Sequence, residues 1–127
     1  MIEKDYIAEI ENLLKGRKKR PVEVLNTILG FLNFSDIDIK IYNLLLKTSL
    51  NIKDIEKQLN LSERTIRKYI KRLYKEGLII RKVKEGKRLK YIYSAVPIQM
   101  VWKKVKNRIQ NIINNISEIV ENKNMII

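Results

Sequence analysis

The side chains that could carry chemistry in this sequence are mostly cationic, and they gather in one stretch. Residues 62–90 hold twelve lysines and arginines but only three acids. Over all 127 residues, 27 basic side chains stand against 14 acidic ones, a net charge of +13. Charge concentrated in this way suits the neutralisation of phosphates. The sequence therefore predicts a polyanionic partner, and nucleic acid first of all.

The residue types that most enzymatic and metal sites require are missing from the sequence. It contains no cysteine and no histidine, which excludes disulfides, thiol chemistry, structural zinc sites and catalysis that depends on histidine. The serines have no histidine to activate them, and the acids are too scattered for the metal site of a nuclease. We expect a protein that is not an enzyme and that uses no metal and no cofactor.

No segment of the sequence is suited to a membrane. Apolar runs fall short of 18 residues, and residues 1–5 mix acids with a base instead of starting an apolar signal segment. We expect a cytoplasmic, nucleoid-associated protein without a membrane partner. Its many isoleucines, lysines and asparagines are typical of an AT-rich genome and favour a prokaryotic, archaeal source.

The residues of 62–76 follow the period of an amphipathic α-helix. Its apolar side is formed by Ile66, Tyr69, Ile70 and Leu73. The opposite side is almost purely cationic, whereas a helix built for solubility alone would normally mix in acids as i,i+4 partners. Its cations are Arg64, Lys68, Lys71 and Lys75, flanked by Arg67 and Arg72.

The place of each side chain along this helix suggests its role. The residues in the first two turns, where base edges are usually reached, are Arg64, Thr65, Arg67 and Lys68. The residues further along, where phosphate contacts are expected, are Lys71, Arg72 and Lys75. Ser62 is predicted both to cap the helix and to bind a phosphate, since a helix N-terminus attracts anions. Taken singly, each lysine could equally be a solvated charge.

Periodicity also locates the elements that must position this helix. Helical spacing predicts four helices before it, over residues 2–14, 22–32, 36–47 and 52–59. Ser35 and Asn51 are expected to cap the last two, and Gly77 to close the helix 62–76 in left-handed geometry. Two runs rich in β-branched and aromatic residues, 78–84 and 88–93, predict a β-hairpin.

Three short helices followed by a hairpin are the order of a winged helix-turn-helix. In such a fold the third helix lies in the major groove of double-stranded DNA, and the wing contacts the adjacent backbone or minor groove. The wing residues expected to do so are Lys84, Lys87 and Arg88.

The segment 52–79, IKDIEKQLNLSERTIRKYIKRLYKEGLI, resembles the core of winged-helix transcription regulators of the MarR and archaeal TrmB-like groups. The shared pattern is an apolar second helix, Ser62 opening the recognition helix, Thr65 three residues later, and a Gly-Leu-Ile exit into the wing at 77–79. The resemblance covers about residues 35–93. It implies a DNA-binding regulator, activating or repressing, with the basal transcription machinery as a further candidate partner. Larger TrmB proteins carry an effector domain for which this chain has no room, so sugar sensing is not expected.

A heptad pattern follows residue 97, with apolar residues separated by 4, 3, 4, 3, 4 and 3 positions. They are Ile98, Trp102, Val105, Ile109, Ile112, Ile116 and Ile119. This seam predicts self-association, and a homodimer matches DNA with two half-sites. Against this, β-branched seams favour trimers or tetramers in isolated coiled coils, and a lone helix could instead cap its own domain.

We thus expect a mainly α fold with a small β-hairpin wing, divided into three parts. Residues 1–34 form an N-terminal helical extension, 35–96 the winged helix, and 97–127 a long C-terminal dimerisation helix. The basic cluster 15–20 is either a solvated loop or a secondary DNA contact. The favoured function is a sequence-specific, homodimeric transcription regulator. The alternatives are a non-specific architectural DNA-binding protein and a winged helix that serves as a protein-interaction module.

Overall fold

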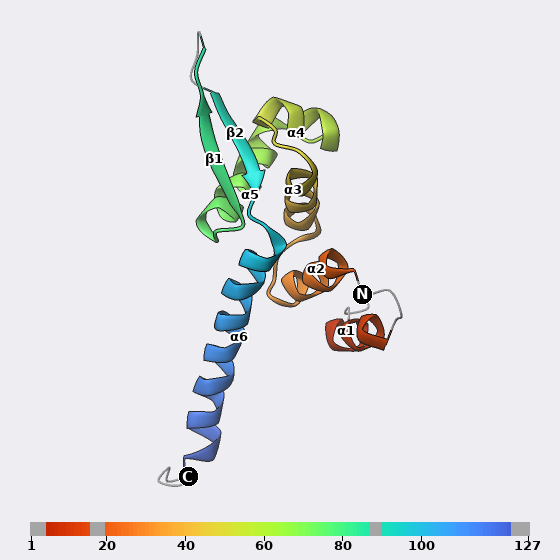
Figure 1. Cartoon of the computed structure of the whole chain (residues 1–127), viewed down its shortest axis with the longest axis vertical. Helices are drawn as coiled ribbons and strands as arrows, with labels where there is room; N and C mark the ends of the chain where they lie inside the picture. The colour runs from red at the N-terminus through yellow and green to blue at the C-terminus, as the bar shows by residue number, and fades with distance from the viewer. Residues whose placement is uncertain (1–4, 16–19, 87–89, 123–127) are drawn as a thin grey trace.

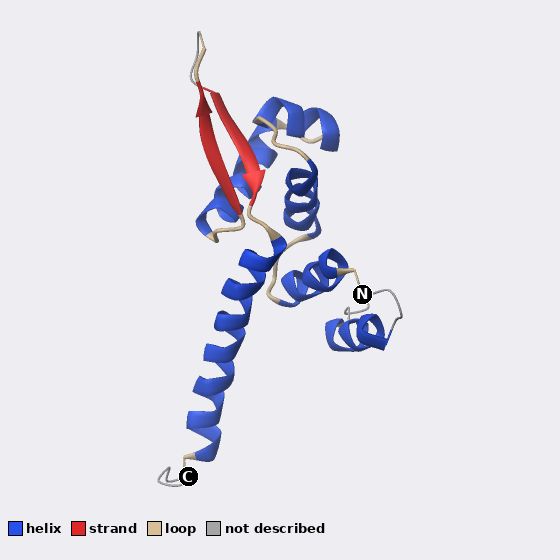
Figure 2. Cartoon of the chain, in the orientation of Figure 1, coloured by secondary structure: helices blue, strands red, loops and turns tan. Residues whose placement is uncertain are grey.

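The computed structural model describes residues 5–15, 20–86 and 90–122. Six helices and two strands follow one another in these ranges (Figures 1 and 2). They are α1 (Tyr6–Lys15), α2 (Pro21–Phe31), α3 (Asp36–Lys47), α4 (Ile52–Leu59), α5 (Glu63–Lys75), β1 (Ile79–Lys84), β2 (Lys90–Ala95) and α6 (Ile98–Glu121). The mainly helical class with a hairpin wing and a long last helix is as predicted.

Helices α3 to α5 and the hairpin form a head from which α6 extends as a single long arm (Figure 1). Strands β1 and β2 are antiparallel, with Ile79 opposite Ala95 and Lys84 opposite Lys90. Leu50, in the link between α3 and α4, exchanges two backbone hydrogen bonds with Tyr93 at 3.0 and 2.8 Å. This bridge joins the hairpin to the link between α3 and α4.

Local side-chain chemistry explains where the head's helices begin and end. Ser35 accepts from the Asp38 amide, and the Asp38 carboxylate accepts from the Ser35 amide, which completes a capping box. Asn51 caps α4 by accepting from the Asp54 amide at 2.8 Å. Gly77 follows α5 with a φ of +80°, a conformation that costs glycine little. These caps were predicted from the residue types alone.

One core fills the space between the head's helices and the hairpin. Its fully buried members come from α3, α4, α5 and β1, namely Ile41, Tyr42, Ile55, Ile66, Leu73 and Ile79. The Tyr42 hydroxyl donates to the Val96 carbonyl at 2.8 Å, and burial raises the pKa of this phenol to about 12. Because Val96 lies two residues before α6, this bond ties the start of the arm to α3.

Helix α2 lies beside the root of the arm, and α1 packs against α2 (Figure 1). Leu25 and Leu29 of α2 are buried in the common core, and Asn26 exchanges side-chain hydrogen bonds with Asn43 of α3 at 2.8 and 3.3 Å. On α6, Val101 and Val105 are buried as well. The first two turns of the arm are therefore part of the head's packing.

Candidate nucleic-acid interface

Helix α5 presents the amphipathic surface that its sequence predicted. Ile66, Ile70 and Leu73 are buried in the core. Ser62 caps the helix, because its hydroxyl accepts from the Thr65 amide at 3.2 Å and donates to the Thr65 hydroxyl at 2.9 Å. The buried face fixes the rotation of the helix, so the residues of its other face point away from the protein.

Four cations occupy that outward face. Arg64, Lys68, Lys71 and Lys75 are all exposed, and within the described ranges none of them forms an ion pair. Their charges are thus uncompensated by neighbouring acids of the head. A row of unpaired cations on a helix that projects from a rigid core is suited to contact a polyanion.

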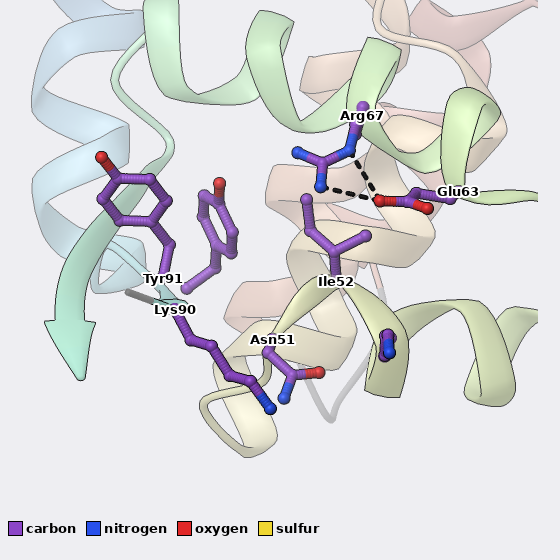
Figure 3. A pocket seen from close by; sticks show the side chains of 8 residues that line it. Asn51, Ile52, Glu63, Arg67, Lys90 and Tyr91 are labelled. Carbon is purple, nitrogen blue, oxygen red and sulfur yellow. Dashed lines mark hydrogen bonds and ion pairs between the residues drawn. The ribbon is translucent and has the colours of Figure 1, made fainter. Parts of the chain in front are cut away.

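Arg67 differs from these four because an acid holds its guanidinium. Its Nε and Nη2 donate to Oε1 of Glu63 at 3.0 and 2.7 Å, an i,i+4 pair on the exposed surface (Figure 3). Nη1 is not used in this pair and keeps its two donors for another partner. The acid one turn earlier therefore orients the predicted base-reading side chain.

Arg72 is not a free cation, and its phosphate contact stays a prediction. Its Nη1 lies 3.1 Å from the buried carboxylate of Asp38, and its Nη2 donates to the Asn33 carbonyl at 2.9 Å. The guanidinium also lies over the Phe34 ring, 4.7 Å from the centroid. The flank of α5 that carries Arg72 faces the start of α3, so this side chain joins two helices of the head.

The wing carries a cationic and aromatic surface that the sequence pattern did not reveal. The Arg81 guanidinium lies between the rings of Tyr74 and Tyr91, 4.6 and 4.4 Å from their centroids. Lys84 is exposed, as expected, while Lys87 and Arg88 fall outside the described residues. Strand pairing places Arg81 opposite Tyr93 and diagonal to Tyr91. This pairing is the feature of the sequence from which the contact between Arg81 and Tyr91 could have been predicted.

A cavity of about 180 Å³ opens between α4, α5 and the wing (Figure 3). Its lining includes three cations from three different elements, namely Lys53, Arg67 and Lys90. Lys53 and Lys90 were not among the predicted site residues, because they are far from α5 in the sequence. Their convergence extends the cationic surface of α5 toward the wing.

The predicted heptad seam is divided by the fold. Val105 is buried in the head, while Ile98 and Ile109 are partly buried against the core. Trp102, Ile112, Ile116 and Ile119 remain 38, 45, 54 and 62% exposed. The seam prediction needs correction at Val105, because this side chain packs within its own chain.

Other classes of site find little support in the described ranges. No group of three or more carboxylates, histidines or cysteines is placed to hold a metal ion there. No helix in those ranges is long and apolar enough to cross a membrane.

A helix-turn-helix with an outward cationic third helix and a two-stranded wing defines the class: a winged-helix, DNA-binding transcription regulator. Residues 29–99 match the family model described as "Sugar-specific transcriptional regulator TrmB". The match spans more than half of the chain, and the chain belongs to this family, as the resemblance of its motifs predicted.

A solved structure with a TM-score of 0.67 supports this fold. A protein of Methanosarcina mazei Go1, described as a "possible transcriptional regulator", superposes with a TM-score of 0.67 over 74% of this chain and 82% of its own, at 15% identity. The adhesin competence repressor (AdcR) of Streptococcus pyogenes aligns over 76% of this chain and 77% of its own, with a TM-score of 0.48 and 21% identity. A comparison with curated proteins finds no significant match.

Proposed function

We propose that this protein regulates transcription by binding specific sites on double-stranded DNA as a homodimer. Helix α5 would enter the major groove, and the hairpin would contact the adjacent backbone or minor groove. The observation that carries the proposal is the outward face of α5, where Arg64, Lys68, Lys71 and Lys75 are exposed without ion-pair partners in the described ranges. The protein would act in the cytoplasm on nucleoid DNA.

The geometry refines the roles of individual side chains. Arg64, Thr65, Arg67 and Lys68 lie in the first two turns of α5 and are assigned to base edges. Ser62, Lys71, Lys75 and Lys84 are assigned to phosphates. Arg72 stays a predicted phosphate contact, with its guanidinium also bound to Asp38 and Asn33. Lys53, Lys90 and Arg81 are added as backbone contacts near the wing.

The second copy is proposed from the exposed half of the seam on α6. A dimer with two-fold symmetry would present two recognition helices to two half-sites. In this scheme residues 35–96 bind DNA, 97–127 join the two copies, and 1–34 support the junction. Recruitment or obstruction of the basal transcription machinery would then give activation or repression.

Selection from a random duplex library at about 0.2 M salt tests the proposal, because binding driven only by phosphates is weak there. We expect enrichment of a motif with two half-sites about 10–11 base pairs apart. Binding that fades with salt and enriches no motif would contradict sequence specificity and indicate an architectural protein. Absence of binding even at low salt would overturn the DNA-binding proposal and favour a protein-interaction module.

A further inference from the structure

An apolar groove lies where the root of α6 passes α2. Val24 and Ile28 of α2 form one wall, and Ile98 and Trp102 of α6 form the other. The hollow measures about 360 Å³, and Trp102 on its edge is 38% exposed. A hollow of this character on a protein surface marks a place where another apolar group packs.

The matching apolar ridge lies at the opposite end of the same helix. Ile112, Ile113, Ile116, Ile119 and Val120 are between 45 and 75% exposed. Because α6 is one continuous helix of 24 residues, about 36 Å long, its ridge cannot fold back onto its own groove. A second copy can bring the two together, since each copy then supplies one ridge and one groove.

Charge on α6 selects the direction in which two copies would pair. Residues 98–108 carry four cations and no acid, whereas 109–121 carry two acids and no cation. A parallel pair would place four cations beside four cations, within the range at which salt screens poorly. An antiparallel pair places unlike halves together and also opposes the two helix dipoles.

We infer that two α6 helices pair antiparallel about a two-fold axis near Ile109, which rests on the proposed homodimer and deepens it. Residues whose numbers add up to 218 then face each other, so Ile116 of the second copy meets Trp102 and Val120 of the second copy meets Ile98. The groove between α2 and α6 is closed by the tip of the other copy's arm. Each groove is thus built from both chains.

The same axis places the two heads at opposite ends of the paired arms. The two Ile98 residues lie 22 helical positions apart in this arrangement, or about 33 Å along the helix axes. A parallel pair would instead start both heads side by side, at an interaxial distance of about 8–10 Å.

Spin labels test the direction of pairing, because the chain has no native cysteine to interfere. A label at Ser117→Cys should give two spins about 24 Å apart along the helix axes if the pair is antiparallel, and close-range dipolar broadening if it is parallel. A short distance at position 117 would overturn the inference and leave the homodimer intact.

Trp102 tests whether the groove is covered, since it is the only tryptophan of the chain. Ile116→Asp should convert the dimer to a monomer in sedimentation and shift the Trp102 emission to the red. The matched control is Asn111→Asp, which adds the same acid to the outer face and should change neither. Loss of the dimer without a change in emission would overturn the inference, because the arm would then pair away from the groove.

Binding of 8-anilinonaphthalene-1-sulfonate, an apolar probe, completes the test. The probe should bind Ile116→Asp more strongly than the wild type, because the groove opens in the monomer. Equal binding would show that the groove is open in the dimer and would contradict the inference. A wild-type protein that sediments as a monomer would overturn the homodimer as well, whereas the DNA selection reports on DNA binding separately.

Discussion

Helices α5 and α6 are both amphipathic, but the chain covers their apolar faces to different extents. Ile66 and Leu73 of α5 are 0% exposed, whereas Ile116 and Ile119 of α6 are 54 and 62% exposed. Their polar faces differ in the opposite sense, since α5 carries lysine and arginine and the far half of α6 carries mainly asparagine and glutamine. In α5 the polar face is the one left to act on a partner, and in α6 it is the apolar face.

Replacing one isoleucine in each helix tests this difference in burial. Ile66→Ala removes fully buried methyl groups, so we expect the free energy of unfolding to fall by about 2–5 kcal/mol. Ile116→Ala, the matched change on α6, removes little that is buried within the chain. Urea unfolding at several protein concentrations checks this: the Ile66 cost should persist at every concentration, and the Ile116 cost should appear only where the wild type is dimeric.

This contrast also corrects the choice of residue for probing the dimer. The heptad pattern alone makes Ile109→Asp an apt test, because position 109 is central in the seam. In the structure Ile109 packs against the core of the head, so an acid there would disturb folding and pairing together. Ile116 is free of such contacts with the core and separates the two effects.

Within α5, the ion-paired Arg72 and the unpaired Lys71 should contribute differently to stability. Arg72→Ala leaves the Asp38 carboxylate, which is 0% exposed, without its cation. Half of the arginine faces solvent, so we expect a loss of about 1–3 kcal/mol in unfolding free energy, less than for a fully buried pair. Lys71→Ala, one position earlier and unpaired, should change stability by less than about 0.5 kcal/mol. Thermal unfolding of both variants checks this, and equal stabilities would return Arg72 to the set of free cations.

Arg67→Ala should act on DNA binding instead of stability. If the guanidinium reads a base, binding to the selected site should weaken by about 1–3 kcal/mol and the preference at that position should relax. Lys71→Ala is the control, since loss of a phosphate contact weakens all sequences alike and lowers the salt slope by about one. Titration of matched and mismatched duplexes separates the two. Uniform weakening by Arg67→Ala would show that this residue binds only phosphate.

The sequence predicted elements whose signals are local, and it failed where the fold brings distant residues together. The caps at Ser35, Asn51 and Ser62 depend on side chains a few residues away, so residue type and spacing sufficed. The contact of Arg72 with Asp38 was missed because this partner lies 34 positions earlier in the chain, and helical periodicity says nothing about which flank meets another helix. The stacking of Arg81 between two tyrosines likewise depends on pairing across the hairpin.

The same reasoning explains the partial success on α6. A repeat of seven residues shows that one face is apolar, but it does not distinguish burial within the chain from burial against a partner. The structure makes this distinction at Val105, which is buried, and at Ile116, which is not. The division occurs where α6 leaves the head, a boundary set by tertiary packing.

The hydrogen bond that joins the head to the arm should make a small contribution to stability that depends on pH. Tyr42→Phe removes the hydrogen bond to the Val96 carbonyl, so we expect a loss of about 1 kcal/mol at pH 7. Burial raises the pKa of Tyr42 from 10.0 to about 12, which means that folding favours the neutral phenol. The stability that this group contributes is therefore present below pH 10 and is lost as the pH rises from 10 to 12.

Urea unfolding of the wild type and Tyr42→Phe between pH 8 and 12 isolates this contribution, because the two proteins differ only in this hydroxyl. The two curves should run in parallel up to about pH 10 and then converge and cross, since only the wild type loses stability as its phenol ionises, and it loses more than the ~1 kcal/mol of the hydrogen bond. Curves that stay parallel to pH 12 would show that the phenol ionises as it does in water. The start of the arm would then be held to the head by apolar packing alone, and the comparison between a fixed root and an exposed tip would rest on Val101 and Val105.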